Sequence, residues 1–334
     1  MTYQLPSRIR SRWLVATAVA AVSALTVSAC SSSAAGAGHD GGAKGGFTLH
    51  VGIVSKVAPD GVIGWGQQQG ILQKDLAAAG VSKVELSTFA TGPTLNAALT
   101  SGSVDVASQG DTPALTLRSN GFQSKVVAIS GIRSNYYLIG KKGGVTKLAD
   151  LVGKKVSAAP GTAPEQYLIG LLKQAGLSNK IKISNLQTND AASALRAGQI
   201  DAFVASGTMA GQFIAQGFPV IDKASDHTGL YTSSVNIAAQ KFLKAHPLFA
   251  AAWAEAFADT VKDIKADPDA YWAFNAKVDK VTTAIAKQAF PLDTLPDTAF
   301  SADGLTELQG SYQFLVEQKR LKNPFDVKSW LASS

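Results

Sequence analysis

The chain has 334 residues, a formal net charge of +7 at pH 7 and a single cysteine, Cys30. One cysteine excludes an intramolecular disulfide, so the folded part must be stabilised by its apolar core. Lysine and arginine form no dense run and no basic stripe interleaved with aromatic residues, which argues against binding of nucleic acid.

Residues 1–29 are typical of a secretory signal peptide. Basic residues at positions 8–12 precede an apolar run over 13–27, which is shorter than the about 20 apolar residues of a membrane-spanning helix. The sequence Leu-Thr-Val-Ser-Ala-Cys that ends at Cys30 resembles the lipobox of bacterial lipoproteins. This resemblance implies cleavage before Cys30 and acylation of its sulfur, which would anchor the chain to the outer face of a bacterial membrane. An ordinary signal peptide with an incidental cysteine is the alternative.

Residues 30–46 follow as the predicted lipidated cysteine and a flexible tether. Serine, alanine and glycine dominate this stretch, so it buries too little apolar surface to fold. An unstructured N-terminus without a role is the alternative. Removal of the three signal arginines leaves 28 basic and 24 acidic residues, a net charge of about +4.

Strand-like and helix-like patterns alternate from Phe47 to about Pro219. Strands are predicted over 47–54, 84–89, 104–107 and 125–129, and helical spacing over 71–80 and 95–99. Such alternation predicts βαβ units around largely parallel sheets, an α/β fold. The about 290 residues after the tether exceed a usual single domain, which favours two lobes.

An internal repeat supports the two lobes. Residues 77–106 and 173–202 align without a gap at an offset of 96, and both carry a Gly-x-x-Asp motif, Gly102/Asp105 and Gly198/Asp201. Each glycine is predicted to end a helix in the left-handed conformation, and each aspartate to lie inside a short buried strand.

The chain becomes helical after about Ala245. Apolar residues recur at helical spacing, which is typical of core packing rather than of a cofactor site. They are Phe249, Trp253, Phe257, Val261 and Ile264, followed by Tyr271, Trp272 and Phe274.

The order of several short motifs resembles ABC-transporter solute-binding proteins of the aliphatic sulfonate, taurine and nitrate branch. The motifs are Gly92-Pro93, Ser-Gly-Ser-Val-Asp at 101–105, Gly-Asp-Thr-Pro at 110–113, Leu-Val-Gly-Lys-Lys-Val at 151–156 and Pro-Gly-Thr at 160–162, with a similar tail from Phe300 to Trp330. The resemblance implies the type II periplasmic-binding-protein architecture, two Rossmann-like lobes joined by two crossover segments. Lobe 1 would comprise 47–136 and 236–334, lobe 2 would comprise 137–235, and the crossovers would lie near 137–138 and 235–236.

Four short segments are candidate ligand contacts. In open α/β sheets ligands bind beyond the carboxyl ends of the strands, where helix N-termini present backbone N–H groups. An ordinary helix cap is the alternative at each segment. The residues are Thr91, Gly92 and Pro93; Gly110, Asp111 and Thr112; Gly161, Thr162 and Ala163; and, by lobe equivalence, Ser206, Gly207 and Thr208.

Two further residues are candidates. Trp65 is flanked by glycines, which is unusual for a core position, so it would floor a pocket or be buried under the lobe. Arg133 precedes the first crossover and would meet a ligand anion, although a solvated arginine is the alternative.

The ligand is predicted to be a small organic solute, sulfonate-like or zwitterionic, rather than nitrate. Thr162 and Glu165 match a capping box, and Asp111 is predicted to lie in the same crevice. Two carboxylates near the site would suit an amine-bearing or neutral ligand better than a bare anion. Ser206 to Thr208 also stand where sulfonate binders of the family often have Trp-Asp-Pro, so a roomier pocket is expected.

No catalytic motif is recognisable: the chain has no G-x-S-x-G, no P-loop and no H-E-x-x-H, and its four histidines are scattered. We therefore expect a monomeric binding protein without a cofactor or metal, which delivers its solute to an ABC permease powered by an ATPase. A sensor that reports to a membrane receptor is one alternative. An enzyme of the thiamine-precursor or menaquinone type on a related fold is another.

Overall fold

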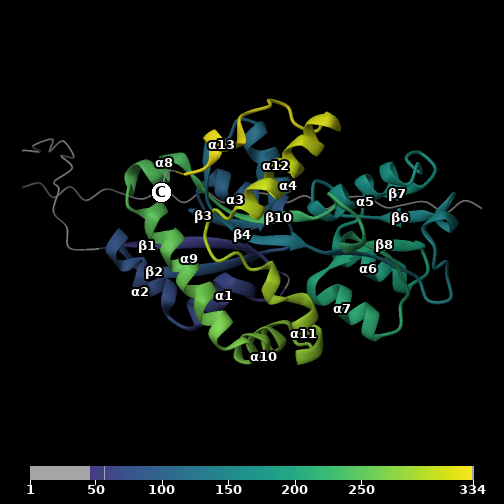
Figure 1. Ribbon diagram of the computed structural model, residues 1–334, viewed down its shortest axis with the longest axis horizontal. Coiled ribbons are helices and arrows are strands. Elements are labelled where there is room, and N and C mark those ends of the chain that lie inside the picture. The colour runs from purple at the N-terminus through teal and green to yellow at the C-terminus, as the bar shows by residue number, and fades with distance from the viewer. Residues whose placement is uncertain (1–45, 56, 333–334) are drawn as a thin grey trace, which may run out of the picture. The chain divides into compact units, whose positions relative to one another are not determined.

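The computed structural model describes residues 46–55 and 57–332 (Figure 1). The predicted signal peptide, Cys30 and the tether up to residue 45 lie outside the described residues. Among the described helices, none combines the length and the apolar character that a membrane span requires.

Two five-stranded sheets organise the described chain. The first sheet has the order β2-β1-β3-β10-β4, in which β1, β2 and β3 are parallel and β10 is antiparallel to both β3 and β4. Its strands are β1 (Phe47–Val54), β2 (Val81–Phe89), β3 (Val106–Gly110), β4 (Ser124–Ser134) and β10 (Thr232–Ala239).

The second sheet repeats this scheme with the order β7-β6-β8-β5-β9. Strands β6, β7 and β8 are parallel, and β5 runs antiparallel to β8 and β9. Its strands are β5 (Tyr136–Gly140), β6 (Lys155–Ser157), β7 (Lys182–Ser184), β8 (Ala202–Ser206) and β9 (Val220–Lys223). The predicted α/β architecture with two lobes is therefore confirmed.

Helices cover both faces of each sheet (Figure 1). The first lobe carries α1 (Gly61–Gln68), α2 (Ile71–Asp75), α3 (Gly92–Ser101), α4 (Asp111–Ser119), α8 (Gln240–Ala245), α9 (Phe249–Ala266), α10 (Pro268–Asp279), α11 (Thr283–Ala289), α12 (Ala302–Glu317) and α13 (Val327–Trp330). The second carries α5 (Ala163–Gln174), α6 (Thr188–Arg196) and α7 (Gly207–Ala215), and short 3-10 turns occupy 77–79, 148–151, 224–226 and 292–294.

The apolar stripe of α9 forms part of the core, as predicted. Phe249, Trp253, Phe257, Val261 and Ile264 are each at most 1% exposed, on the face of the first sheet that α1 and α2 also cover. Complete burial of a large apolar side chain contributes about 1.5–3 kcal/mol relative to exposure, so this stripe fixes the C-terminal third onto the first lobe.

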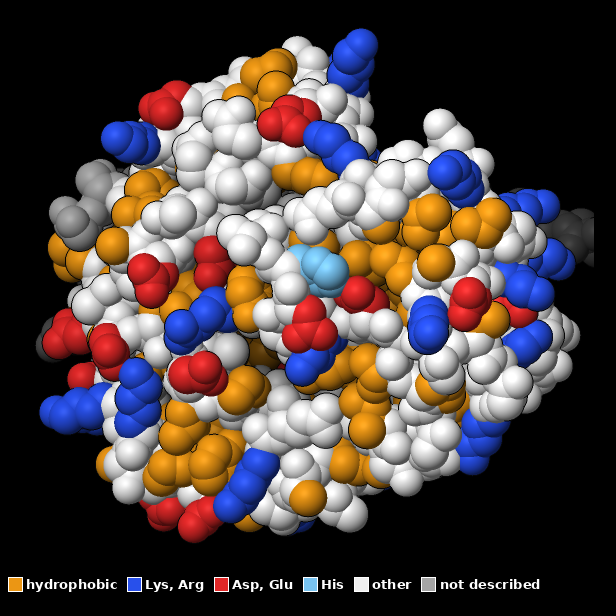
Figure 2. All heavy atoms as spheres, turned by 45° about the vertical axis from the view of Figure 1, so that its right-hand side comes forward, with side chains coloured by type: hydrophobic (Ala, Val, Ile, Leu, Met, Phe, Trp, Pro, Cys, Tyr) orange, Lys and Arg blue, Asp and Glu red, His pale blue; other side chains and the backbone are white. Residues whose placement is uncertain are grey.

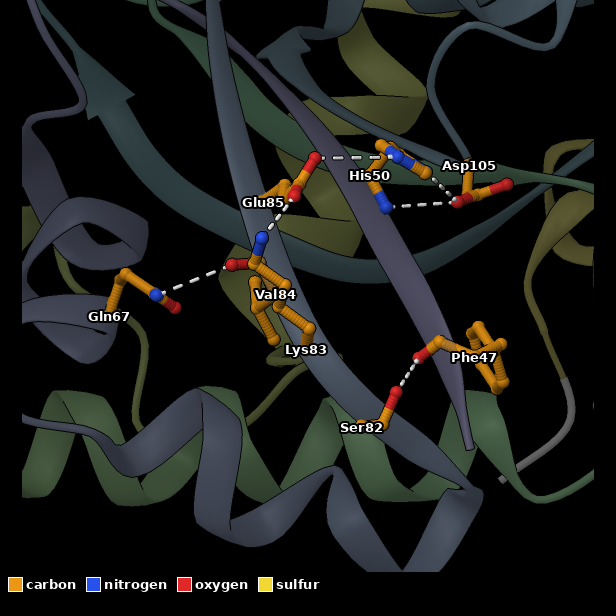
Figure 3. Close-up of polar contacts among 8 residues, drawn as sticks. All are labelled: Phe47, His50, Gln67, Ser82, Lys83, Val84, Glu85 and Asp105. Atoms are coloured by element: carbon orange, nitrogen blue, oxygen red, sulfur yellow. Dashed lines mark hydrogen bonds and ion pairs between the residues drawn. The ribbon is translucent and has the colours of Figure 1, made fainter. Parts of the chain in front are cut away.

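The paired Gly-x-x-Asp motifs form the same brace in both lobes. Gly102 and Gly198 have positive φ values of 81° and 71° at the ends of α3 and α6, as predicted. The Asp105 carboxylate accepts the His50 backbone N–H at 2.9 Å (Figure 3). The Asp105 N–H donates to the His50 carbonyl at 2.8 Å.

The second brace is equivalent. Asp201 accepts the Lys155 N–H at 3.0 Å and donates its N–H to the Lys155 carbonyl at 2.8 Å. The aspartates differ from the prediction in one respect: they lie just before β3 and β8 and are partly exposed, because their carboxylates reach sideways to the neighbouring strand.

The chain passes between the sheets twice. It leaves the first sheet after β4 and enters β5 with only Asn135 between the strands, close to the predicted position. It returns through 224–231, earlier than predicted, because 232–235 pair with β3 and β4 in the first sheet. The Asn135 side chain joins the two passages, since its Oδ1 accepts the Ser225 N–H at 3.0 Å.

Candidate functional site

A cleft of about 690 Å³ lies between the carboxyl ends of the parallel strands of the two lobes. Val54, Thr91 and Gly110 line it at the ends of β1, β2 and β3, and Thr162 and Ser206 line it after β6 and β8. Both chain passages also contribute, because residues 133–137 and Ser225 are part of the wall. The cleft therefore sits where ligands bind in open α/β sheets.

Several helices begin at the cleft, and their N-termini differ in how they are capped. At α3 the Thr94 N–H donates to Thr91 Oγ1 and the Thr91 N–H donates to Thr94 Oγ1, a reciprocal box at 3.4 and 3.2 Å. The N-cap residues of α4, α5 and α7, which are Gly110, Thr162 and Ser206, make no side-chain cap hydrogen bond. An acceptor group in the cleft would therefore meet helix N-termini whose own N-cap side chains do not cover them.

Eight of the predicted contact residues line the cleft, and six do not. The lining residues are Thr91, Gly92, Gly110, Arg133, Thr162, Ala163, Ser206 and Gly207; the others are Trp65, Pro93, Asp111, Thr112, Gly161 and Thr208.

Trp65 belongs to the core and does not floor the cleft. It is 4% exposed, packs edge-on against Tyr271 and Phe274, and donates its Nε1–H to Asp263 at 2.7 Å. The flanking glycines are explained by close packing of α1. A Cβ at Gly64 would lie 2.4 Å from the Pro59 carbonyl oxygen, and one at Gly66 would lie 2.7 Å from Thr260 Oγ1.

Asp111 stabilises the first lobe and does not line the cleft. Its side chain is fully buried and accepts hydrogen bonds from the Ser233 N–H, the Ser233 hydroxyl and the Ser311 hydroxyl, each at 2.8 Å. Burial raises the pKa of Asp111, and these hydrogen bonds oppose the shift. Thr112 extends the network by donating to Gln166 of α5 at 2.7 Å, and Gln166 donates to Ser311 at 3.2 Å.

Glu165 is also held away from the cleft. The predicted capping box does not form, because the Thr162 hydroxyl donates to the Ala159 carbonyl. The Glu165 carboxylate instead accepts the Gly161 N–H at 2.8 Å and pairs with Arg320 at 2.6 Å. Neither Asp111 nor Glu165 lines the cleft; the carboxylates that do line it are those of Asp60 and Asp293.

Pro93 and Gly161 meet at the rim where the two lobes approach each other. A Cβ at Gly161, which has a φ of +70°, would lie 3.5 Å from Pro93 Cγ. A Cβ at Gly110 would likewise lie 3.7 Å from Ala163 Cβ. These four residues therefore bring the first and second lobes into close approach beside the cleft.

Arg133 lines the cleft, but its guanidinium is already engaged. It donates to the Asp293 carbonyl, and its backbone N–H donates to Glu307 at 2.8 Å. Arg133 has a positive φ of 52°, an uncommon conformation for a residue with a side chain. Burial of Glu307, opposed by the Arg133 N–H, raises the pKa of that carboxyl to about 7.

Sequence reasoning missed the aromatic wall of the cleft. Tyr136, Tyr137, Tyr231, Tyr271 and Phe290 all line it. Tyr136 and Tyr137 adjoin the first crossover and could have been included with Arg133. The other three come from separate segments that only the fold brings together, so no local pattern marks them.

The charge of the lining is low. Arg133, Asp60 and Asp293 are charged, and the described lining residues include no lysine, histidine, cysteine or glutamate. The site therefore combines polar helix ends with aromatic and aliphatic side chains, an arrangement that suits binding of a small organic molecule.

Comparisons with known proteins agree with this architecture. A family model described as NMT1/THI5 like matches residues 77–271, and the chain belongs to this family. A curated protein of Escherichia coli (strain K12), provisionally named an aliphatic sulfonates-binding protein, is 30% identical over 125 residues. This match spans 36% of the chain and 39% of the relative's length.

Several solved structures have the same fold as this chain over most of its length. The alkanesulfonate-binding protein SsuA from Xanthomonas axonopodis pv. citri, bound to MOPS, matches with a TM-score of 0.69 and 19% identity. It covers 87% of this chain and 99% of its own. An enzyme has the same fold: a mutant of DszB in complex with biphenyl-2-sulfinic acid matches with a TM-score of 0.64 and 18% identity, over 85% and 96% of the two chains.

Proposed function

We propose that the protein is the solute-binding component of an ABC importer, which captures an organic sulfonate or a closely related anion between its lobes. The cleft at the strand ends is the main support for the proposal, because uncapped helix N-termini and aromatic side chains line the same volume of about 690 Å³. The name of the Escherichia coli relative and the ligand of the SsuA structure support the same class of solute.

The two kinds of wall suggest how the solute would lie. Its anionic head would accept hydrogen bonds at the starts of α5 and α7, where Thr162 and Ser206 leave the N-termini without side-chain caps. Its organic body would pack against the aromatic residues of the lining, of which Tyr231 and Phe290 are partly exposed. A nitrate ion would leave that wall without contacts, so the volume favours a larger solute.

Contacts to both lobes would stabilise the closed form, because only a difference in affinity can shift the equilibrium between open and closed states. The closed form would then dock on a permease, and an ATPase would drive import while this chain, acting as a monomer, performs no chemistry. The polar helix ends and aromatic side chains of the described cleft lining support binding rather than catalysis.

Isothermal titration calorimetry with a panel of solutes tests this proposal. We expect aliphatic and aromatic sulfonates to bind with micromolar or tighter affinity, amino-sulfonates more weakly, and nitrate not measurably. Tight nitrate binding, or no binding of any sulfonate, would overturn the proposed class of solute.

A matched pair of glycine variants tests whether the solute binds in the cleft. Gly207 lines the cleft and Gly198 does not; both have positive φ values, and no heavy atom lies within 4 Å of either position's Cβ. Gly207→Leu should lower sulfonate affinity at least about 100-fold by filling the cleft. Gly198→Leu carries the same kind of backbone strain and should leave affinity unchanged; equal losses would contradict the placement.

We also propose that Cys30 is lipidated and holds the protein at the outer face of the membrane. The lipobox-like sequence before Cys30 supports this. Metabolic labelling with an alkyne fatty acid should modify the wild-type chain and not a Cys30→Ser variant. Equal labelling of the wild-type and Cys30→Ser chains would contradict lipidation of Cys30.

A further inference from the structure

The far end of the second lobe is rich in lysine. We define the lysine-rich end as Lys141, Lys142, Lys154, Lys155, Lys180 and Lys182, of which all but Lys141 are exposed. Residues 141–182 contain eight lysines and only two acidic residues, Asp150 and Glu165. Residues 141–182 are therefore strongly positive although the net charge of the whole chain is modest.

Hydrogen bonds place these lysines together. Lys155 and Lys182 are the first residues of the parallel strands β6 and β7. The Lys182 N–H donates to the Lys154 carbonyl, and the Lys180 carbonyl accepts the Gly153 N–H. The lysine-rich end thus lies at the amino ends of the strands, opposite the cleft, and Figure 2 shows blue side chains gathered towards the right-hand edge, on the second-lobe side.

The lysines have little compensation from acidic groups. Lys155 and Lys182 are direct register partners on neighbouring strands, where like charges are destabilising. Asp201 is already engaged, because one oxygen pairs with Lys141 at 2.8 Å and the other accepts the Lys155 N–H. Within the described residues, Lys154, Lys155, Lys180 and Lys182 form no salt bridge.

Comparison with the first lobe indicates that the fold itself does not require lysines at these positions. There the register partners at the same place are His50 and Glu85, with side chains 3.6 Å apart, and Asp105 and Lys83 lie beside them (Figure 3). Charges of both signs are therefore interleaved on the first lobe. At the same place the second lobe has lysines at both register positions, and Asp201 is the acidic residue beside them.

We propose that the lysine-rich end is a docking surface for an anionic lipid bilayer. Lysine ammonium groups are compact charges without a fixed hydrogen-bonding geometry, so they suit a diffuse layer of phosphate headgroups better than a shaped protein pocket. Val152, 50% exposed between Leu151 and Gly153 in this loop, adds an apolar side chain that can enter the interface. The proposal rests on the proposed function only in that a tethered solute-binding protein works beside a membrane.

Lysine footprinting on the full chain tests the proposal. The protein is bound to phosphatidylcholine vesicles with or without phosphatidylglycerol, acetylated briefly and analysed by mass spectrometry. Lys154, Lys155, Lys180 and Lys182 should react at least about threefold more slowly when phosphatidylglycerol is present, and high salt should remove the protection. Lys241 and Lys244, exposed on α8 of the first lobe, should react equally on both vesicles.

Charge-reversed variants make the comparison specific. Lys155→Glu/Lys182→Glu should abolish the protection of Lys154 and Lys180, whereas Lys241→Glu/Lys244→Glu, with the same change in net charge, should leave it intact. Sulfonate affinity should be unchanged in both, so failure of the docking surface is distinguishable from failure of solute binding. Equal protection of both lobes, or protection only when a permease is added, would overturn the proposal; the latter would assign the surface to an acidic protein partner.

Discussion

The two lobes use one backbone scheme for different purposes. Both have the same strand order, and both fasten their central strands with an aspartate that binds the neighbouring strand, Asp105 on His50 and Asp201 on Lys155. Both lobes share this contact because it joins neighbouring segments of the sheet. The surrounding side chains differ, with mixed charges around Asp105 and lysines around Asp201.

A second difference lies where the lobes face each other. After β3 the first lobe has Asp111, whose buried carboxyl holds Ser233 and Ser311, and after β8 the second lobe has Gly207, which lines the cleft. Equivalent positions thus serve cohesion in one lobe and access for solute in the other. Sequence equivalence between repeats therefore transfers the backbone conformation but not the role of a side chain.

The largest effect is expected at Asp111. Asp111→Ala would leave two hydroxyls and one backbone N–H without their buried acceptor, at a loss of about 3 kcal/mol in the free energy of unfolding. Gly207→Ala should cost less, about 1–2 kcal/mol, from its positive φ alone. Urea unfolding measures both, and equal losses would break the comparison.

The braces should differ by a smaller amount. Asp201→Ala is expected to cost about 2 kcal/mol and Asp105→Ala about 1 kcal/mol, because Asp201 also offsets nearby lysines. Burial alone would raise the pKa of Asp201, but hydrogen bonds from Lys141 and Lys155 and the charges of Lys141 and Lys154 lower it.

The contribution of ionised Asp201 is accordingly present above its ordinary pKa of 3.8 and is lost as the pH falls through the lowered value. Urea titrations of the wild type and of Asp201→Asn at several pH values should converge in acid. Parallel curves would contradict the assignment.

Equivalent helices of the two lobes differ in their N-terminal capping, and this difference is worth about 1 kcal/mol in the free energy of unfolding. Thr91 and Gln187, which stand at the repeat offset, are the N-cap residues of α3 and α6, and Thr91 alone caps through its side chain. Thr91→Ala should lower the free energy of unfolding by about 1 kcal/mol, whereas Gln187→Ala should change it by no more than about 0.3 kcal/mol. A loss at Gln187 as large as at Thr91 would contradict the capping difference.

The smallest effect concerns Glu307 beside the first passage between the lobes. Because its pKa is raised from 4.5 to about 7, the folded state holds a proton that the unfolded state has released, so stability falls as the pH rises through this window. Relative to Glu307→Gln, the wild type should lose about 0.5–1 kcal/mol between pH 5 and pH 8, since solvent screens a partly exposed carboxyl. Thermal unfolding at the two pH values measures the difference, and an identical pH dependence would contradict it.

The sequence predicted the strand-end segments that surround the cleft because glycines and capping residues mark strand–helix junctions locally. It did not predict side-chain direction: Asp111 follows a lining glycine, yet its carboxylate turns away from the cleft to Ser233 and Ser311 of the first lobe. Helix α1 was missed because its glycines suggest a loop, whereas contacts with Pro59 and Thr260 require them. Tyr231 and Phe290 reach the cleft from distant segments, and only tertiary packing unites them.

Asn135 is the whole connection between β4 and β5, and its side chain also holds the returning segment at Ser225. Asn135 thereby joins the outgoing and returning segments, in addition to the pairing of β4 with β10. A change in the direction of one connecting segment would therefore move the other as well. The two lobes would rotate relative to each other about a hinge at Asn135.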